Sequence, residues 1–259
     1  ILKTNLKKIL LIDKSDFMIK KLPDLSIDIT FDFRSDSSGL DPDSHSPTLK
    51  KYHQYLWTKP LPSGEIFNLT SNFKNKYLVY KNEKDIHYLS SDSITNSYAT
   101  QDVIPPVISK VSPELVKSFI DMNSTIGSFL LFPSNRINGR QTINQHRGTH
   151  HLIRDRFDLT LECIRRHYLQ QNSPLADTLN RYKNFFELFK DFKSYIDFFL
   201  LNDLVTPDYS RILFFNEFHE NFNLPPIPES VESYLEYRKN SMSFTQLRNL
   251  RIQSYASSD

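Results

Sequence analysis

The period of the hydrophobic pattern changes near residue 150, and this change limits the folds open to the chain. Before it, apolar residues occur in short runs or alternate with polar ones, as in 27–33 and 77–94. Such alternation is typical of strands with one buried face. After it, apolar residues recur at helical spacing, as at Ile153, Phe157 and Ile164. We therefore predict an α+β fold, in which a small mixed or antiparallel sheet from the N-terminal half packs against a mostly helical C-terminal half.

Capping and turn residues indicate where the individual helices and strands begin and end. Ser46 and Pro47 have the residue types of a helix N-cap and first helical position, and they open a predicted helix that runs to about residue 59. Further helices are expected near 113–121, from about residue 150 onward and over 225–239. We predict strands over 27–33, 77–82, 87–94, 126–133 and 211–215. The polar stretch 134–148 is predicted to be a loop.

We find no repeat and no clear linker, so we predict a single domain over 1–259. Within it we expect a lead-in helix or arm over 1–26, a strand-rich part over 27–135 and a helix-rich part over 136–240. Residues 241–259 are expected to form a C-terminal tail.

Composition sets the broad class of protein. Hydrophobic residues make up 39% of the chain and charged residues 24%, which is ordinary for a globular protein. No run approaches the 18 apolar residues of a membrane span, so we expect no membrane partner. The single cysteine, Cys163, favours a reducing compartment, and we expect a cytoplasmic protein. A net charge of +2 leaves any attraction for nucleic acid to local patches.

The densest polar cluster follows the first predicted strand. Arg34, Asp36, Asp43 and Ser46 lie on a loop, with Asp41 and His45 between them. Loops at strand ends often carry ligand-binding groups, which favours a nucleotide site. Two alternatives stay open: the carboxylates hold a metal ion, or they form turns and helix caps only. The spacing does not fit a calcium loop, because no glutamate stands at its twelfth position.

On the next predicted helix, His53 and Trp57 are four residues apart and so share one face. They are candidates for stacking a nucleotide base, although a buried aromatic core explains Trp57 more simply. Further along, Ser90 and Ser91 follow an apolar strand segment, and their hydroxyls are candidates for binding a ribose.

The segment 135–166 is the most basic part of the chain. Asn144 and Arg147 precede a predicted helix, whose N-terminus would reinforce phosphate binding, and Arg156 adds to the positive charge. Neither of the two glycine-rich phosphate-binding motifs occurs. Glu162 falls in a predicted stripe with Arg154, Asp158 and Arg166, which forms either a solvated ladder of ion pairs or the wall of a cleft. In the cleft alternative, Glu162 acts as a base or binds a ribose hydroxyl. Glu217 is a further candidate carboxylate.

Three strings carry a resemblance: DFRSDSSGLDPDSHSPTLKKYHQYLWTKPLPSGEIFNL, YLSSDSI and TINQHRGTHHLIRDRFDLTLECIRRHY. Over about 28–240 the chain resembles an uncharacterised bacterial family without an established activity. It is also weakly similar to ADP-ribosyltransferase toxins. That similarity implies Arg34 as the strand-end arginine, Ser90 and Ser91 as the serine-rich strand, and Glu162 or Glu217 as the catalytic glutamate. The Ser-Thr-Ser motif of those toxins is absent.

We consider three functions. The first is a nucleotide-using enzyme, specifically an NAD-dependent ADP-ribosyltransferase of the toxin or phage-defence type that needs no metal. In it Arg34 and Arg147 hold phosphates and a glutamate stabilises the transition state. The second is a metal-dependent phosphodiesterase or nuclease that uses the aspartates near Asp43. The third is a non-catalytic module that binds RNA or a partner protein such as an antitoxin.

Overall fold

A four-stranded antiparallel sheet forms the middle of the molecule. The computed structural model describes residues 26–71, 77–100 and 104–257. The strands follow the order β1 (Thr70–Ser71), β2 (Leu78–Lys81), β3 (Ile86–Ser93) and β4 (Phe129–Pro133). The register pairs Leu78 with Leu89 and Ser91 with Leu131. β4 is buried along its whole length, so both of its faces are covered by other elements. The predicted small antiparallel sheet is therefore confirmed.

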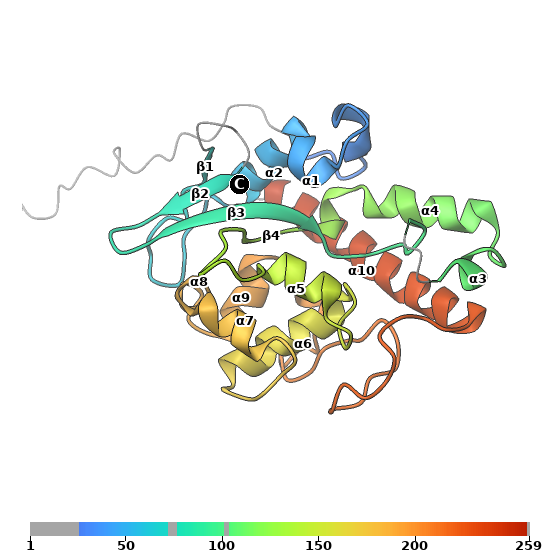
Figure 1. Cartoon of the computed structure of the whole chain (residues 1–259). Helices are drawn as coiled ribbons and strands as arrows, with labels where there is room; N and C mark the ends of the chain where they lie inside the picture. Colours follow the sequence, from blue (N-terminus) through green and yellow to red (C-terminus); the bar gives the residue numbers. More distant parts are fainter. Residues whose placement is uncertain (1–25, 72–76, 101–103, 258–259) are drawn as a thin grey trace, which may run out of the picture.

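Helices surround the sheet and dominate the C-terminal half. In order along the described chain they are α1 (Pro42–His45), α2 (Pro47–Trp57), α3 (Pro105–Ile108), α4 (Pro113–Asn123), α5 (Ile143–Thr149), α6 (Phe157–Tyr168), α7 (Ala176–Arg181), α8 (Lys183–Glu187), α9 (Phe192–Phe198) and α10 (Val231–Ser257). Three short 3₁₀ helices are η1 (Phe33–Asp36), η2 (Ile126–Ser128) and η3 (Asn202–Leu204). In Figure 1, α1 and α2 lie above the long strand β3, and α5 to α9 lie below it. The long helix α10 packs against α4, η2 and η3. The α+β class is as predicted.

Local chemistry explains why α2 begins where the sequence predicts. The Ser46 hydroxyl accepts a hydrogen bond from the backbone N–H of Leu49, and Pro47 occupies the first helical position. The Ser46 hydroxyl also donates to Asp36, whose other oxygen accepts the N–H of Thr48. Two backbone N–H groups that would otherwise lack partners at the helix end are thus satisfied.

The core is rich in aromatic rings. One cluster of buried hydrophobic residues runs from Ile27 to Ile252. Trp57 is fully buried against Phe198 and Phe199, so it belongs to the core and does not stack a ligand. A single domain stays a prediction.

The strand predicted over 27–33 is wrong. This segment forms turns that lead into η1. The Asp28 carboxylate accepts the backbone N–H of Thr30, and the Asp32 carboxylate accepts that of Arg34. Aspartate side chains compete for backbone donors in this way, and such local bonds outweigh the alternating pattern.

Two boundaries in the middle of the chain also differ from the prediction. The loop predicted over 134–148 contains most of α5, which starts with a capping box between Thr142 and Gln145. The next helix begins at Phe157 rather than near residue 150, because Arg154 and Asp155 adopt positive φ angles of 44° and 68°. The backbone therefore turns sharply before α6 can start.

The C-terminal part is more helical than expected. Residues 211–215 form no strand; Ile212 makes a single bridge with Val205. Helix α10 continues to Ser257, so the residues expected to form a tail, 241–257, are helical instead. They stay helical because Phe244, Arg248 and Ile252 are buried against the rest of the molecule. Most of the lead-in predicted over 1–26 lies outside the described residues.

No helix in the described ranges is both long enough and apolar enough to cross a membrane.

Candidate functional site

Two pockets meet where α1 packs against β3, and they share a wall of carboxylates. Asp41, Asp43 and Asp92 line both pockets. The serine-side pocket, of about 670 Å³, is lined in addition by Tyr77, Tyr88, Ser90, Ser91, Arg136 and Asn144, among others. The Arg34-side pocket, of about 330 Å³, is lined in addition by Arg34, Ser93, Thr95, Asn96, Asn123 and Asp155, among others. Asp43 and Asp92 are therefore reachable from two sides.

Arg147 from α5 balances the negative charge behind this wall. Its side chain is fully buried, and its Nη1 lies 2.6 Å from Asp92 Oδ2 and 2.6 Å from Asp155 Oδ1. Its other nitrogens donate to the Asp155 carbonyl and the Thr160 hydroxyl. All three nitrogens of the guanidinium are occupied, so Arg147 holds carboxylates in place rather than a phosphate.

Asp43 is the carboxyl group with the most unusual environment. Burial raises its pKa to about 7, and the nearby charge of Asp41 adds to this. Ser91 and the Ser93 backbone oppose the rise by hydrogen bonding. Its Oδ1 is buried and has no hydrogen-bond partner among the described residues. The raised pKa of Asp43 and the lack of a donor for its Oδ1 both indicate a site whose hydrogen bonding is incomplete.

Asp92 is the second carboxyl group of the wall with a raised pKa. Burial raises the pKa of Asp92 well above its ordinary value, Arg147 opposes this, and Asp155 and Asp43 raise it further. Because one arginine faces several carboxyl groups, Asp43 and Asp92 cannot easily both be charged. The ion pair with Arg147 favours the charged form of Asp92, while burial of both groups favours one bound proton for the pair.

A second unsatisfied acceptor lies in the serine-side pocket. Asn144 stands in the first turn of α5, and its Oδ1 is buried without a partner in the described chain. Tyr77 and Tyr88 line the same pocket, with ring centroids 6.4 Å apart in an edge-to-face arrangement. The pocket thus offers two acceptors and two aromatic rings to a ligand that carries donors and a flat ring.

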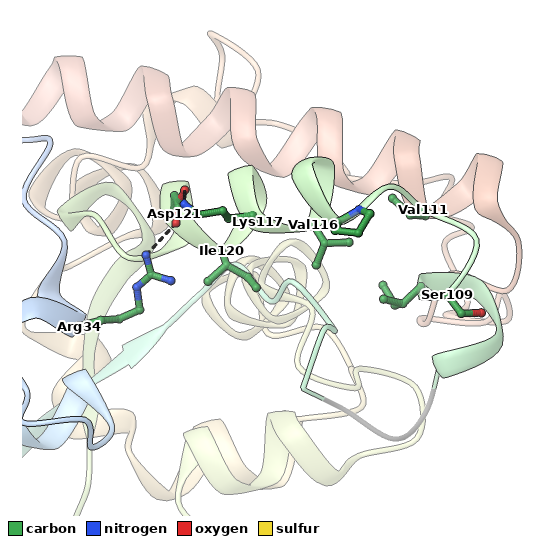
Figure 2. A pocket seen from close by; sticks show the side chains of 9 residues that line it. Arg34, Ser109, Val111, Val116, Lys117, Ile120 and Asp121 are labelled. Atoms are coloured by element: carbon green, nitrogen blue, oxygen red, sulfur yellow. Dashed lines mark hydrogen bonds and ion pairs between the residues drawn. The ribbon is translucent and has the colours of Figure 1, made fainter.

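A third pocket is less suited to chemistry. It lies between Arg34 and α4, has a volume of about 520 Å³, and is lined mainly by apolar side chains. Figure 2 shows Ile120 and Val116 in this pocket, with Arg34 directed at Asp121. Arg34 pairs with Asp121 and Asp32, and Lys117 also pairs with Asp121. The charged groups of this third pocket therefore pair with one another.

Comparison with known proteins adds a family but no activity. The model of DUF6994, described as a family of unknown function, matches residues 27–252. The chain belongs to this family. No curated protein and no solved structure matches it. The resemblance to an uncharacterised family is thus confirmed for this DUF6994 chain, whereas these comparisons do not show the similarity to ADP-ribosyltransferases.

Several residues predicted from the sequence do lie at the carboxylate wall. Asp43, Ser90, Ser91 and Asn144 line the serine-side pocket of this DUF6994 protein, and Arg34 lines the other one. The sequence alone did not indicate that segments around residues 43, 91 and 144 converge.

Other predicted residues serve the fold. Asp36 and Ser46 cap α2. His53 is buried between the Ser91 hydroxyl and the Trp57 indole, each within hydrogen-bond distance of one ring nitrogen. Burial lowers the pKa of His53 to about 3, so the imidazole is neutral. The His53 ring contacts the Ser91 hydroxyl and lines neither pocket.

The remaining candidates lie elsewhere. Arg156 is buried and pairs with Asp158. Glu162 is buried and binds Arg165 and Arg166, and Glu217 is exposed beside His219. Neither glutamate lines either pocket, so Arg34, Ser90 and a glutamate are not brought together as the toxin similarity implies.

The predicted stripe on α6 is also different from either alternative. Arg154 lies outside the helix, while Asp158 and Glu162 are buried in ion pairs of their own. The stripe is therefore neither a solvated ladder nor the wall of these pockets.

The residues considered as metal ligands do not all converge: Asp41 and Asp43 line the shared wall, whereas Asp36 and His45 do not. Asp36 caps a helix, and the His45 ring is exposed and bonds the carbonyl of Asp41. Within the described ranges, no group of three or more potential ligands is arranged to hold a metal ion.

Sequence reasoning did not single out Asp155, Tyr77 or Tyr88 as site residues. The capping pattern from Thr142 to Gln145 was a usable signal, since it shows that Asn144 begins a helix instead of lying in a loop. Nothing local signals the pairing of Arg147 with Asp92, 55 residues apart.

Proposed function

We propose that the chain is an enzyme that cleaves an N-glycosidic bond of a nucleotide by general acid–base catalysis. The observation that carries the proposal is the carboxyl pair at the shared wall, in which Asp43 keeps a proton near pH 7 while Asp92 is held against Arg147. Pairs of carboxyl groups in different protonation states are the usual means of breaking glycosidic bonds.

The step balances as a hydrolysis. Asp43 donates its proton to the leaving nitrogen of the base as the bond from C1′ to that nitrogen breaks. Asp92 takes a proton from a water molecule, whose oxygen bonds to C1′. The products are the free base and the sugar, and the proton passes back from Asp92 to Asp43 before the next turnover.

The lining of the serine-side pocket supports such a substrate. The unsatisfied oxygens of Asp43 and Asn144 suit donors on a sugar or a base. The faces of Tyr77 and Tyr88 suit a flat base. NAD belongs among the test substrates, because its nicotinamide–ribose bond is N-glycosidic. Its nicotinamide leaves as a neutral ring that takes no proton, so with NAD only the activation of water by Asp92 applies. Transfer of ADP-ribose from NAD, in toxin action or phage defence, is a narrower form of this proposal.

The test incubates the protein with nucleosides, nucleoside monophosphates and NAD at pH 7, once with magnesium and once with a chelator. Chromatography measures the free base that is released. We expect release without magnesium. Asp43→Asn and Asp92→Asn should each lower the rate about 10²–10⁴-fold. Glu217→Gln is the matched control, because this exposed carboxylate lines neither pocket.

Full activity in Asp43→Asn with loss in Glu217→Gln would overturn the proposal in favour of the toxin-like arrangement. Activity that requires magnesium would favour the nuclease alternative. No cleavage of any substrate, combined with salt-dependent RNA binding, would favour the binding module.

A further inference from the structure

One positive charge at the serine-side pocket has no partner among the described residues. Arg136 lines this pocket on the loop that follows β4, and it is exposed. It makes no hydrogen bond or ion pair within the described part of the chain. An unpaired guanidinium beside a polar pocket is suited to bind the planar edge of a phosphate or carboxylate.

The other arginines near the carboxylate wall are already paired. Arg34 binds Asp32 and Asp121 and does not line the serine-side pocket. Arg147 is buried between Asp92 and Asp155. Arg136 is thus the single unpaired cation among the described residues that line the serine-side pocket. A single unpaired cation can bind one anionic group of a ligand.

The carboxylates restrict where an anion can bind. A phosphate next to Asp43 and Asp92 would be repelled by the negative charge of the wall. Arg136 belongs to the exposed loop and not to this wall, so a phosphate bound there can stay solvated. The sugar and base would then extend from the phosphate toward Asp43, Asn144 and the tyrosine rings.

Resting on the function proposed above, we infer that the substrate is a nucleoside monophosphate whose phosphate binds Arg136 at the mouth of the serine-side pocket. A dinucleotide carries a second phosphate, for which the described lining offers no further unpaired cation. The glycosidic bond lies at Asp43 and Asp92, and the base lies beside Tyr77 and Tyr88.

The experiment measures binding without turnover, by calorimetry on the Asp43→Asn protein. The probes are the 5′-monophosphates of adenosine, guanosine, cytidine and uridine, the four nucleosides and NAD. Adding Arg136→Ala should weaken binding of the preferred monophosphate about tenfold and change binding of its nucleoside less than twofold. Arg140→Ala is the matched control, because Arg140 is exposed on the same loop but does not line the pocket.

Three results would overturn the inference: equal effects of the two arginine variants, nucleosides binding as tightly as monophosphates, or NAD binding more tightly than any monophosphate. The two proposals fail separately. Monophosphate binding that depends on Arg136, without base release by the wild-type protein, removes only the catalytic proposal. Base release that depends on Asp43 but not on Arg136 removes only the phosphate site.

Discussion

At the scale of the residue, the protonation of Asp43 links the site to stability. In the folded protein its carboxyl stays protonated up to about pH 7, whereas an ordinary aspartate loses its proton near 3.8. Because the folded pKa is the higher one, the stabilising contribution is complete below the ordinary value and is lost as the pH rises through about 7. At pH 8 the folded protein carries the full cost of burying this charge.

We therefore expect Asp43→Asn to be more stable than the wild type at pH 8, on the order of 2–4 kcal/mol, and equal to it at pH 4. Urea unfolding at the two pH values measures the difference. Asp121→Asn serves as the control of opposite sign, because Lys117 and Arg34 lower the pKa of Asp121. It should be slightly less stable at pH 8. An Asp43→Asn protein that is less stable than the wild type at pH 8 would contradict the protonation of Asp43.

At the scale of the element, the N-terminus of α2 depends on Ser46. This hydroxyl is fully buried and joins the helix to Asp36. Ser46→Ala should lower the free energy of unfolding by about 2 kcal/mol, since the partly buried Asp36 carboxylate also loses a donor. The matched variant is Ser112→Ala, at the exposed cap of α4, with an expected loss of about 0.5–1 kcal/mol. Chemical denaturation of both variants checks this, and an equal loss would show that Asp36 contributes nothing to the cap.

At the scale of the whole molecule, α10 is joined to the sheet through η2. Arg248 donates to the carbonyls of Gly127, Phe129 and Phe199, and Asn249 accepts the N–H of Gly127. A β-carbon at residue 127 would overlap the backbone oxygen of Thr245 in α10.

We expect Gly127→Ala to destabilise the protein by about 3 kcal/mol, because the backbone of α10 must move away. Gly148→Ala is the control, since the nearest atom to its β-carbon would be 3.9 Å away; alanine in that helix should be neutral or slightly stabilising. Thermal unfolding of the two variants separates these outcomes. An unchanged melting temperature for Gly127→Ala would mean that α10 is not held at this point.

Local rules in the sequence determined several elements of this protein. The cap at Ser46 and Pro47, the strands near 78–81 and 86–93 and the helical periodicity after residue 150 were readable because they depend on neighbouring residues. Local rules failed at 27–33, where Asp28 and Asp32 bind the backbone, and at 241–257, where burial against distant segments keeps the helix intact.

The tertiary structure alone decided the site. Sequence reasoning named Asp43, Ser91 and Asn144 as separate candidates. It also predicted that Arg147 binds a phosphate. Packing of α1 against β3 and of α5 against β4 placed Arg147 between Asp92 and Asp155 instead. Burial there raised the pKa of Asp43 and left its Oδ1 without a donor among the described residues. Burial and long-range ion pairs depend on which segments meet in three dimensions, and no local pattern of residues encodes that.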